Sequence, residues 1–341
     1  MHKKISVIIA VKPGRGYEEA LSAIGEADYP KGLIEVIIVK GYQPSKQRNE
    51  AAKSAGGEII YFLDNDSIVV ESALTKIVNS CSDQEIAGPP ARGLVAGVGG
   101  PSIAPSVNSF LQNLFGYVLT LRFGTLNLRP RYSQVGKIRD AKEDDLILCN
   151  LSFRKDIFLE EGGFDERLYP NEENELFHRL SAKGYKILYD PDLLVYRSQR
   201  RTVRSFISQI FIYGRGRMEQ MFVRASVVSV FRLLPLAFVL YLILAPFIIN
   251  IPYAEAPLIS YAALAIFFSI VGVLRLRKIQ ALLILPVVYT AMHAAYGMGL
   301  LWGLARKILY IKKNIKDLEI KIEKIKTFSD EGIIDKSGVL R

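Results

Sequence analysis

The sequence is poor in cysteine, histidine and tryptophan, with two, three and one of these residues among 341. Cys81 and Cys149 lie in apolar or mixed stretches without the spacing of a metal site, which predicts free buried thiols in a reducing compartment. A clear secretory signal is also missing, because the first apolar run, residues 5–11, is short for a signal core and no small-residue cleavage site follows it. We expect this run to be the first buried strand of a cytoplasmic domain.

Charged residues are absent from three long runs in the last third of the chain, at residues 233–251, 257–274 and 279–305. At about 1.5 Å per helical residue, each run can cross or nearly cross a hydrocarbon core of ~30 Å. The preceding sequence mixes short apolar runs with charges, glycines and prolines, as soluble α/β domains do. We therefore expect an integral membrane protein with a soluble domain at 1–225, a membrane domain at 226–305 and a basic amphipathic tail at 306–341.

The formal net charge of +10 raises the question of nucleic-acid binding. No recognition motif or stripe of basic and aromatic residues accompanies it, so nucleic acid is not an expected partner. Attraction to anionic lipid headgroups explains the surplus more simply in a chain with apolar runs. The loop at 250–256 contains no base, whereas Arg275, Arg277 and Lys278 follow the second run. By the positive-inside bias, this second loop and the soluble domain lie on the cytoplasmic side of the plasma membrane.

The third apolar run complicates this orientation. If it crossed the membrane fully, the tail from residue 306, with ten basic and six acidic residues, would lie outside. Pro286 and the glycines at 297, 299 and 303 favour two short helices that dip into the membrane and return, which keeps the tail in the cytoplasm. Full crossing is the alternative.

Two amphipathic segments flank the apolar runs. Residues 203–225 combine apolar side chains with arginines, including Arg204 and Arg215, and we expect them either to lie at the membrane surface or to cover the sheet. In the tail, isoleucine and leucine recur from Ile308 to Ile325 with spacings of 3, 4, 3, 4 and 3. This heptad pattern predicts a helix that joins two copies of the chain or packs on the soluble domain or the headgroups.

Strands and helices alternate at the start of the soluble domain. We expect strands at 5–11, 35–39 and 59–63 and helices at 17–27 and 45–55. This alternation predicts an α/β fold with a mostly parallel sheet. Ligands of such sheets bind at the carboxyl ends of the strands, so the residues just past each strand are the first candidates for a site.

Asp64-Asn65-Asp66 directly follows the third expected strand. Two carboxylates separated by one residue can face one crevice and share a divalent cation, whose other ligands are phosphate oxygens and water. Oxygen ligands favour Mg²⁺ or Mn²⁺ over zinc. Taken alone, an ordinary turn held by side-chain hydrogen bonds explains the triplet at least as well.

A second acidic cluster opens the helix expected at 171–183. Asn171 is its predicted N-cap and Gly184 its stop, with Glu172, Glu173 and Glu175 in the first turn. Acidic residues in a first turn are stabilised by the helix dipole without any further role.

In chain order the motifs are Arg48-Asn49, Gly56-Gly57-Glu58, Asp64-Asn65-Asp66, Gly162-Gly163-Phe164-Asp165, Glu172-Glu173-Asn174-Glu175-Leu176, Arg179-Leu180, Gly184-Tyr185, Asp190-Pro191 and Val195-Tyr196. This ordered set, within residues 1–217, resembles the family 2 inverting glycosyltransferases of the GT-A fold, in the membrane-associated type with C-terminal transmembrane segments. The set is far more specific than any one of its pieces. The resemblance implies a GT-A (nucleotide-diphospho-sugar transferase) Rossmann-like domain and a metal-dependent transferase of the hexosyltransferase type.

The resemblance also implies roles for individual residues. Asp66 would be the principal metal ligand with Asp64 beside it, and Arg48 would belong to the donor site. Glu173 would be the catalytic base. Arg179 falls on a later arginine of the motif, where a salt bridge within the domain is the simpler explanation. Weaker candidates on the acceptor side are Asn150, which could equally satisfy backbone groups in its apolar run, Glu172 and Arg215.

Two departures from the family pattern limit these implications. Lys40-Gly41-Tyr42 follows the second strand where the family commonly has an acid that contacts the base, so the sequence does not separate UDP from GDP donors. Processive synthases carry Gln-x-x-Arg-Trp, of which only Gln209 is present.

The expected function is transfer of a sugar from a nucleotide-sugar donor to a lipid-linked acceptor, either a polyprenyl phosphate or a lipid-borne glycan, in polysaccharide or glycoprotein assembly. The alternatives are a processive polysaccharide synthase and a non-catalytic scaffold for other membrane enzymes. Product length separates the first alternative from the expected function, and nucleotide binding separates the second.

Overall fold

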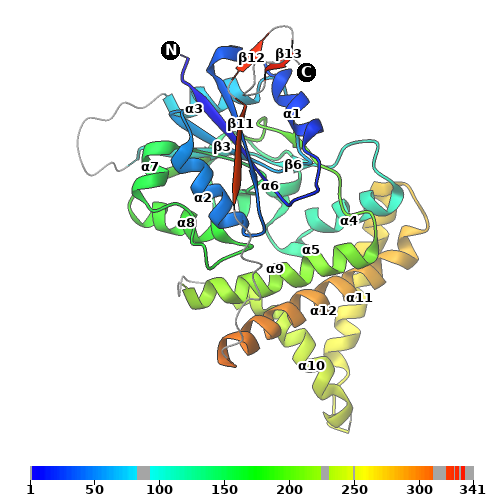
Figure 1. Ribbon diagram of the computed structural model, residues 1–341. Coiled ribbons are helices and arrows are strands. Elements are labelled where there is room, and N and C mark those ends of the chain that lie inside the picture. The colour runs from blue at the N-terminus through cyan, green and yellow to red at the C-terminus, as the bar shows by residue number, and fades with distance from the viewer. Residues whose placement is uncertain are drawn as a thin grey trace. The chain divides into compact units, whose positions relative to one another are not determined.

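The computed structural model describes residues 2–82, 93–223, 230–248, 250–309, 320–325, 327–329 and 332–334 (Figure 1). The chain forms two compact units. The sheet unit comprises residues 1–105, 127–198 and 314–341, and the helix unit comprises residues 106–126 and 199–313. This division differs from the boundary expected near residue 225, because the segment that follows residue 198 packs with the apolar helices.

The sheet unit is built on a mixed sheet that has eight strands among the described residues. Their order is β11 (Lys321–Ile325), β2 (Ile34–Lys40), β1 (Ile5–Val11), β3 (Ile59–Leu63), β8 (Asn150–Arg154), β5 (Val95–Gly99), β9 (Lys186–Tyr189) and β7 (Arg139–Asp140). Strands β2, β1 and β3 run parallel, as the sequence predicts, and so do β5 and β9. The remaining pairs are antiparallel, so the sheet as a whole is mixed and not mostly parallel.

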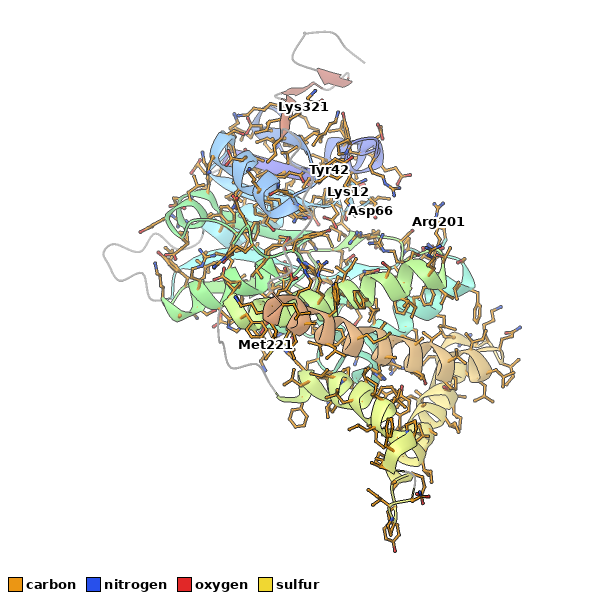
Figure 2. The ribbon with its side chains drawn as sticks, turned by 60° about the horizontal axis from the view of Figure 1, so that its bottom comes forward. Lys12, Tyr42, Asp66, Arg201, Met221 and Lys321 are labelled. Atoms are coloured by element: carbon orange, nitrogen blue, oxygen red, sulfur yellow. The ribbon has the colours of Figure 1, made fainter. Side chains whose placement is uncertain are left out.

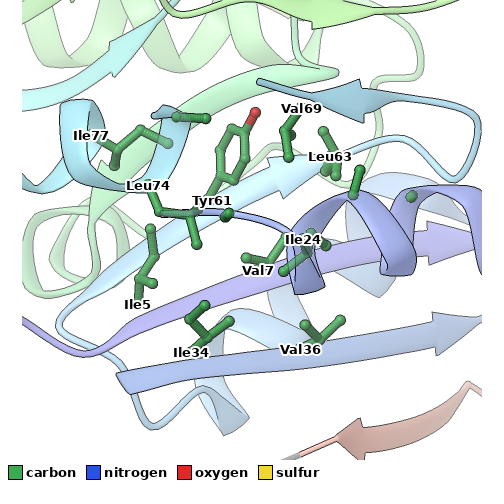
Figure 3. Close-up of a cluster of buried hydrophobic side chains, with 14 of the residues drawn as sticks. Ile5, Val7, Ile24, Ile34, Val36, Tyr61, Leu63, Val69, Leu74 and Ile77 are labelled. Atoms are coloured by element: carbon green, nitrogen blue, oxygen red, sulfur yellow. The ribbon is translucent and has the colours of Figure 1, made fainter. Parts of the chain in front are cut away.

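Helices cover both faces of this sheet. Helices α1 (Glu18–Gly25) and α3 (Ala73–Ser82) lie on one face, and α2 (Pro44–Ser54), α7 (Lys155–Glu160) and α8 (Glu172–Ala182) lie on the other. Alternate residues of β1 enter opposite cores because side chains of a strand alternate between its faces: Ile5 and Val7 join the first core and Ile8 the second. Figure 3 shows the first core, in which Tyr61 of β3 lies near Leu74 of α3. The expected α/β class is confirmed.

The sheet unit also contains a small three-stranded sheet. It consists of β4 (Ile68–Val69), β10 (Val195–Tyr196) and β6 (Ser102–Ile103). Shorter elements of the sheet unit are α6 (Arg129–Tyr132), the 3-10 helices Lys31–Leu33 and Glu143–Asp145, and the hairpin of β12 (Thr327–Ser329) and β13 (Gly332–Ile334). Both cysteines are free and buried, as expected.

The tail contributes an edge strand. The heptad helix predicted to reach Ile325 is wrong at its C-terminal end, because β11 pairs antiparallel with β2, Lys321 opposite Lys40. The physical reason is a second periodicity: Ile320 and Ile322 alternate, as strand residues do, and pack against the second core. Residues 310–319 of the predicted seam lie outside the described residues. Residues 321–325 therefore do not belong to the helix that was predicted to join two copies of the chain.

The helix unit contains α4 (Phe110–Thr120), α5 (Arg122–Thr125), α9 (Val203–Val223), the 3-10 helix Val230–Leu233, α10 (Leu234–Ile248), α11 (Ala256–Leu276) and α12 (Ala281–Ile308). Three helices of the described chain are long and apolar enough to cross a membrane: Phe231–Ile248, Ala256–Leu276 and Ala281–Ile308. The buried share is larger for α12, at 39%, than for the first and second of these helices, at 6% and 17%. The helix unit thus has the composition of a membrane-associated domain.

Helix α12 is continuous, so the break expected at Pro286 and the glycines does not occur. The glycines serve close packing instead. A Cβ atom on Gly299 would lie 2.2 Å from the carbonyl oxygen of Phe211 in α9, and one on Gly303 would lie 2.8 Å from that of Arg215. On α9, a Cβ on Gly214 would lie 2.1 Å from the carbonyl oxygen of Tyr296. Small residues at these positions let the two helix backbones approach each other.

Candidate active site

Polar residues follow the three parallel strands at one edge of the main sheet. Lys12 follows β1, Tyr42 follows β2 after a short turn, and Asp66 follows β3, and the strand register brings these ends to the same side. Figure 2 shows these three labelled residues in the sheet unit. This edge is where ligands of parallel sheets bind.

The triplet after β3 is held by arginines and not only by a turn. The amide nitrogen of Ser67 donates to the carbonyl oxygen of Asp64 at 3.1 Å, which closes the turn. The Arg197 guanidinium spans both carboxylates: its Nη1 lies 3.0 Å from Oδ2 of Asp64, and its Nε donates to Oδ1 of Asp66 at 2.7 Å. Asn65 turns away and donates to the carbonyl oxygen of Gly16 at 2.6 Å. Both carboxylates therefore contact the same guanidinium group.

Arg48 of α2 links the triplet to the acidic helix α8. Its Nη2 donates to Oδ1 of Asp64 at 3.3 Å, and its Nη1 donates to Oε1 of Glu172 at 2.8 Å. The Arg48 and Glu172 side chains are both nearly inaccessible, at 7% and 1% exposed. A buried ion pair of this kind carries a large desolvation cost, which good geometry offsets only in part.

The first turn of α8 is built differently from the predicted N-cap. Asn171 takes the N-cap position in a left-handed conformation, φ 80°, and its side chain does not cap the helix. Its Oδ1 instead accepts from Nδ2 of Asn174 at 2.9 Å. Gly184, φ 88°, follows the end of the helix as expected.

Glu172 is a buried carboxyl with an unusual proton affinity. Burial raises its pKa to about 7, the Arg48 guanidinium opposes this rise, and the carboxylate of Glu173 adds to it. Among the described residues, its Oε2 has no hydrogen-bond partner. This enclosed side chain contacts Arg48, and its role on the acceptor side stays a prediction.

Glu173, the predicted base, lies beside Arg131 of α6. The carboxylate Oε1 of Glu173 is 3.7 Å from Nη1 of Arg131, and the residue is 8% exposed. Arg131 is itself fixed, because its Nη2 donates to the carbonyl oxygen of Glu143 and to Oδ1 of Asn174, each at 2.8 Å. Arg131 thus orients the first turn of α8.

Asn150, a weaker candidate, and Arg179 have other surroundings. Asn150 is fully buried: its Nδ2 donates to the carbonyl oxygens of Pro101 and Leu193, and its Oδ1 accepts from the Tyr61 hydroxyl. This matches the alternative in which it satisfies core groups, and it leaves no polar atom of its amide for an acceptor. Arg179 pairs with Glu175 within α8 and donates to nearby carbonyls, as its simpler explanation requires.

Arg215 belongs to the helix unit, where it lies on α9. Its Nε is 3.5 Å from Oε1 of Glu219, and Arg306 at the end of α12 donates to the same oxygen at 2.7 Å. These contacts tie α9 to α12.

Sequence reasoning missed Arg197 and Arg131. Arg197 directly follows Val195-Tyr196, the last quoted motif, so its position was a usable signal. Arg131 sits in Arg129–Tyr132, a helix too short to leave a periodic pattern.

The residues at the triplet fit a divalent cation on one condition. Within the described parts of the chain, no cluster of three or more histidine, cysteine or acidic residues could hold a metal. Asp64 and Asp66 supply two carboxylates, and Mg²⁺-type ions commonly take their remaining ligands from substrate phosphates and water. The condition is that Arg197, which contacts both carboxylates, gives way.

The sheet unit has a glycosyltransferase fold, which is the fold class that the motifs led us to expect. Mannosyltransferase PcManGT from Pyrobaculum calidifontis, solved in complex with GDP-Man and Mn²⁺, matches with a TM-score of 0.59 and 15% identity over 90% of this chain and 88% of that chain. S. aureus TarS in complex with UDP covers 98% of this chain and 99% of its own with 15% identity, but its TM-score of 0.41 is too low to add to the fold assignment.

Two sequence comparisons complete this picture. The succinoglycan biosynthesis protein ExoA of Rhizobium meliloti (strain 1021) is 36% identical over 85 residues, which is 25% of this chain and 26% of that protein. The match therefore spans about a quarter of the relative. No protein-family model matches the chain.

Proposed function

We propose that the protein is a glycosyltransferase that moves a sugar from a nucleotide-sugar donor to a lipid-linked acceptor at the cytoplasmic face of the plasma membrane. The observation that carries the proposal is the cluster at the strand ends. Arg48 of α2 pairs with Asp64 after β3 and with Glu172 of α8, and Asp66 pairs with Arg197. Glu173 is next to Glu172 in the first turn of α8. Groups of both signs held in one place suit the departure of a diphosphate and the activation of an acceptor.

In the proposed reaction, the donor diphosphate lies at Asp64 and Asp66. A bound Mg²⁺ or Mn²⁺ would neutralise the charge that develops on the departing diphosphate. Glu173 takes the proton of an acceptor hydroxyl, or positions an acceptor oxygen that is already ionised, as that oxygen attacks the anomeric carbon. Attack from the face opposite the diphosphate inverts the configuration of the sugar.

A role in polysaccharide assembly on a lipid is supported by two separate observations. The relative from Rhizobium meliloti is a succinoglycan biosynthesis protein. The helix unit offers long apolar helices, of which α10 and α11 bury little of their surface within the protein. Such helices would retain the enzyme where a polyprenyl phosphate or a lipid-borne glycan resides.

The proposed topology has two crossings, and the path of the chain supports it. The chain leaves the sheet unit after residue 198, and β11 pairs with β2 of that unit. In the proposed topology, the pairing of β11 with β2 keeps both ends of the helix unit on the side of the sheet unit, so the number of crossings is even. We assign the crossings to α10 and α11. Helix α12, which is more buried and packs along α9, would then lie at the membrane surface.

The test is a donor screen with the purified full-length chain in detergent. UDP- and GDP-sugars carrying a radiolabel are incubated with lipid extract, with and without Mn²⁺, and the label is measured in the organic phase. The proposal expects label from one donor in a lipid product one sugar longer than the acceptor, only with the metal. A long polymer would point to a processive synthase. Failure of every nucleotide to bind in calorimetry would point to a scaffold.

A further inference from the structure

The feature that the proposed reaction leaves unused is Arg197. Its backbone is fixed by the small sheet: Val195 pairs with Val69 on one side, and the amide of Arg197 donates to the carbonyl oxygen of Ile103 at 2.9 Å. Its side chain remains 20% exposed and reaches the triplet. The guanidinium is therefore attached to a rigid strand but can swing about its own flexible stem.

The contacts of Arg197 coincide with those of a metal. The guanidinium reaches Oδ2 of Asp64 at 3.0 Å and Oδ1 of Asp66 at 2.7 Å, so a single cation already bridges the two proposed metal ligands. Arg48 adds a second positive charge against Oδ1 of Asp64 at 3.3 Å. The two carboxylates thus face two guanidinium groups, and little net negative charge is left to attract a divalent cation.

We propose that Arg197 occupies the cation position of the triplet in the nucleotide-free protein and that the diphosphate of the donor draws it away, so that metal and donor bind together. This inference rests on the proposed function. Guanidinium groups bind phosphate oxygens through paired hydrogen bonds, so Arg197 exchanges one anionic partner for another when the donor arrives. The carboxylates that it releases then become available to the metal.

The coupling works in both directions. If nucleotide raises the affinity for metal, metal raises the affinity for nucleotide by the same factor. Removing Arg197 removes the competitor in the free protein and also one phosphate partner in the complex. The coupling between metal and nucleotide should therefore shrink in a variant without this guanidinium.

The experiment measures Mn²⁺ binding by the free-ion signal in electron paramagnetic resonance, with full-length protein in detergent. The proteins are the wild type, Arg197→Gln and Arg197→Lys. Arg154→Gln is the matched control, because Arg154 pairs with a single surface carboxylate, Asp156, and its loss changes the net charge equally. Circular dichroism and thermal melting check that each variant is folded.

Without nucleotide, we expect Arg197→Gln to bind Mn²⁺ about tenfold more tightly than the wild type, with Arg197→Lys between them. Arg154→Gln should match the wild type. With UDP or GDP, the Mn²⁺ affinity of the wild type should rise by a larger factor than that of Arg197→Gln. Equal nucleotide-free affinities of the wild type and Arg197→Gln would overturn the inference, and so would a wild-type Mn²⁺ affinity that stays unchanged when nucleotide is bound.

Failure of the inference and failure of the proposed function give different results. If nucleotide binds and supports transfer while Arg197→Gln leaves Mn²⁺ affinity unchanged, the enzyme assignment stands and the role of Arg197 is wrong. If no nucleotide binds to any of the proteins, the proposed function is wrong. The nucleotide-free comparison still decides whether Arg197 competes with the metal.

Discussion

The strand-end site of the sheet unit and the α9–α12 interface of the helix unit achieve close contact by different means. In the sheet unit, charged side chains meet: Arg48 bridges Asp64 and Glu172 in a largely buried position. In the helix unit, glycines let backbones meet, as Gly299 does on α12. Buried charges usually add less stability than apolar groups of the same shape, so their presence in the sheet unit is better explained by chemistry than by folding. The glycines need only a structural explanation.

Gly299→Leu should have the largest effect and should break the helix unit. Its Cβ alone would lie 2.2 Å from the carbonyl oxygen of Phe211, which belongs to a backbone that cannot move without separating α9 from α12. We expect a loss of about 3 kcal/mol or more, seen as aggregation in detergent and a lower melting temperature. The neighbouring Met298, 46% exposed, gives the control Met298→Leu, which should melt like the wild type. Equal melting of both variants would show that the glycine contact is not required.

Arg131→Gln tests the sheet unit at its charged site. The variant loses the guanidinium that faces Glu173 and the fork that donates to the carbonyl oxygens of Glu143 and Asp144. Because Glu173 would be less well oriented, we expect the turnover number to fall about tenfold with donor affinity unchanged. Arg129→Gln, on the same short helix but exposed, is the control. A change in donor affinity alone would assign Arg131 to the donor site instead.

Glu172→Gln tests the pH dependence of stability, where we expect the smallest of these effects. The pKa of Glu172 is raised to about 7 in the folded protein by burial, whereas in the unfolded chain it is ordinary. The unfolded state therefore gives up this proton first, and stability falls as pH rises from about 5 to about 7, by at most ~1.4 kcal/mol per pH unit. Melting temperatures measured across this range should decline more steeply for the wild type than for Glu172→Gln. Identical slopes would contradict the raised pKa, and Glu160→Gln, an exposed control, should keep the wild-type slope.

The sequence predicted the first half of the sheet well because local patterns determine it. Strands β1 and β3 have the predicted bounds, and Asp64 and Asp66 follow β3 as expected. The position of Arg197 directly after Val195-Tyr196 marks it, but its contact with Asp66 spans 131 residues, and no local pattern reports the partner over such a separation. The tail was misread because its isoleucines satisfy a heptad and, with Ile320, an alternating pattern. The tail forms strand β11 because its residues pair with β2 at the edge of the sheet.

In the helix unit, too, the sequence did not reveal which segments pack together. Its apolar runs were found from composition alone, yet the glycines at 297, 299 and 303 were interpreted as helix breaks. They lie within a continuous helix, and its partners supply the reason for their small size: α9 faces Gly299 and Gly303, and α10 faces Gly297. Composition identifies a membrane-associated segment, but only the packing partner explains which of its residues must be small.

The most direct test of the central claim is the comparison of donor binding and sugar transfer in Glu173→Gln. The assignment of Glu173 as the base predicts that this variant binds the donor with Mn²⁺ as the wild type does, while transfer falls by about 100-fold or more at saturating donor. Asp66→Asn should instead lose the metal-dependent part of donor binding. Wild-type transfer by Glu173→Gln would contradict the claim that this carboxylate activates the acceptor.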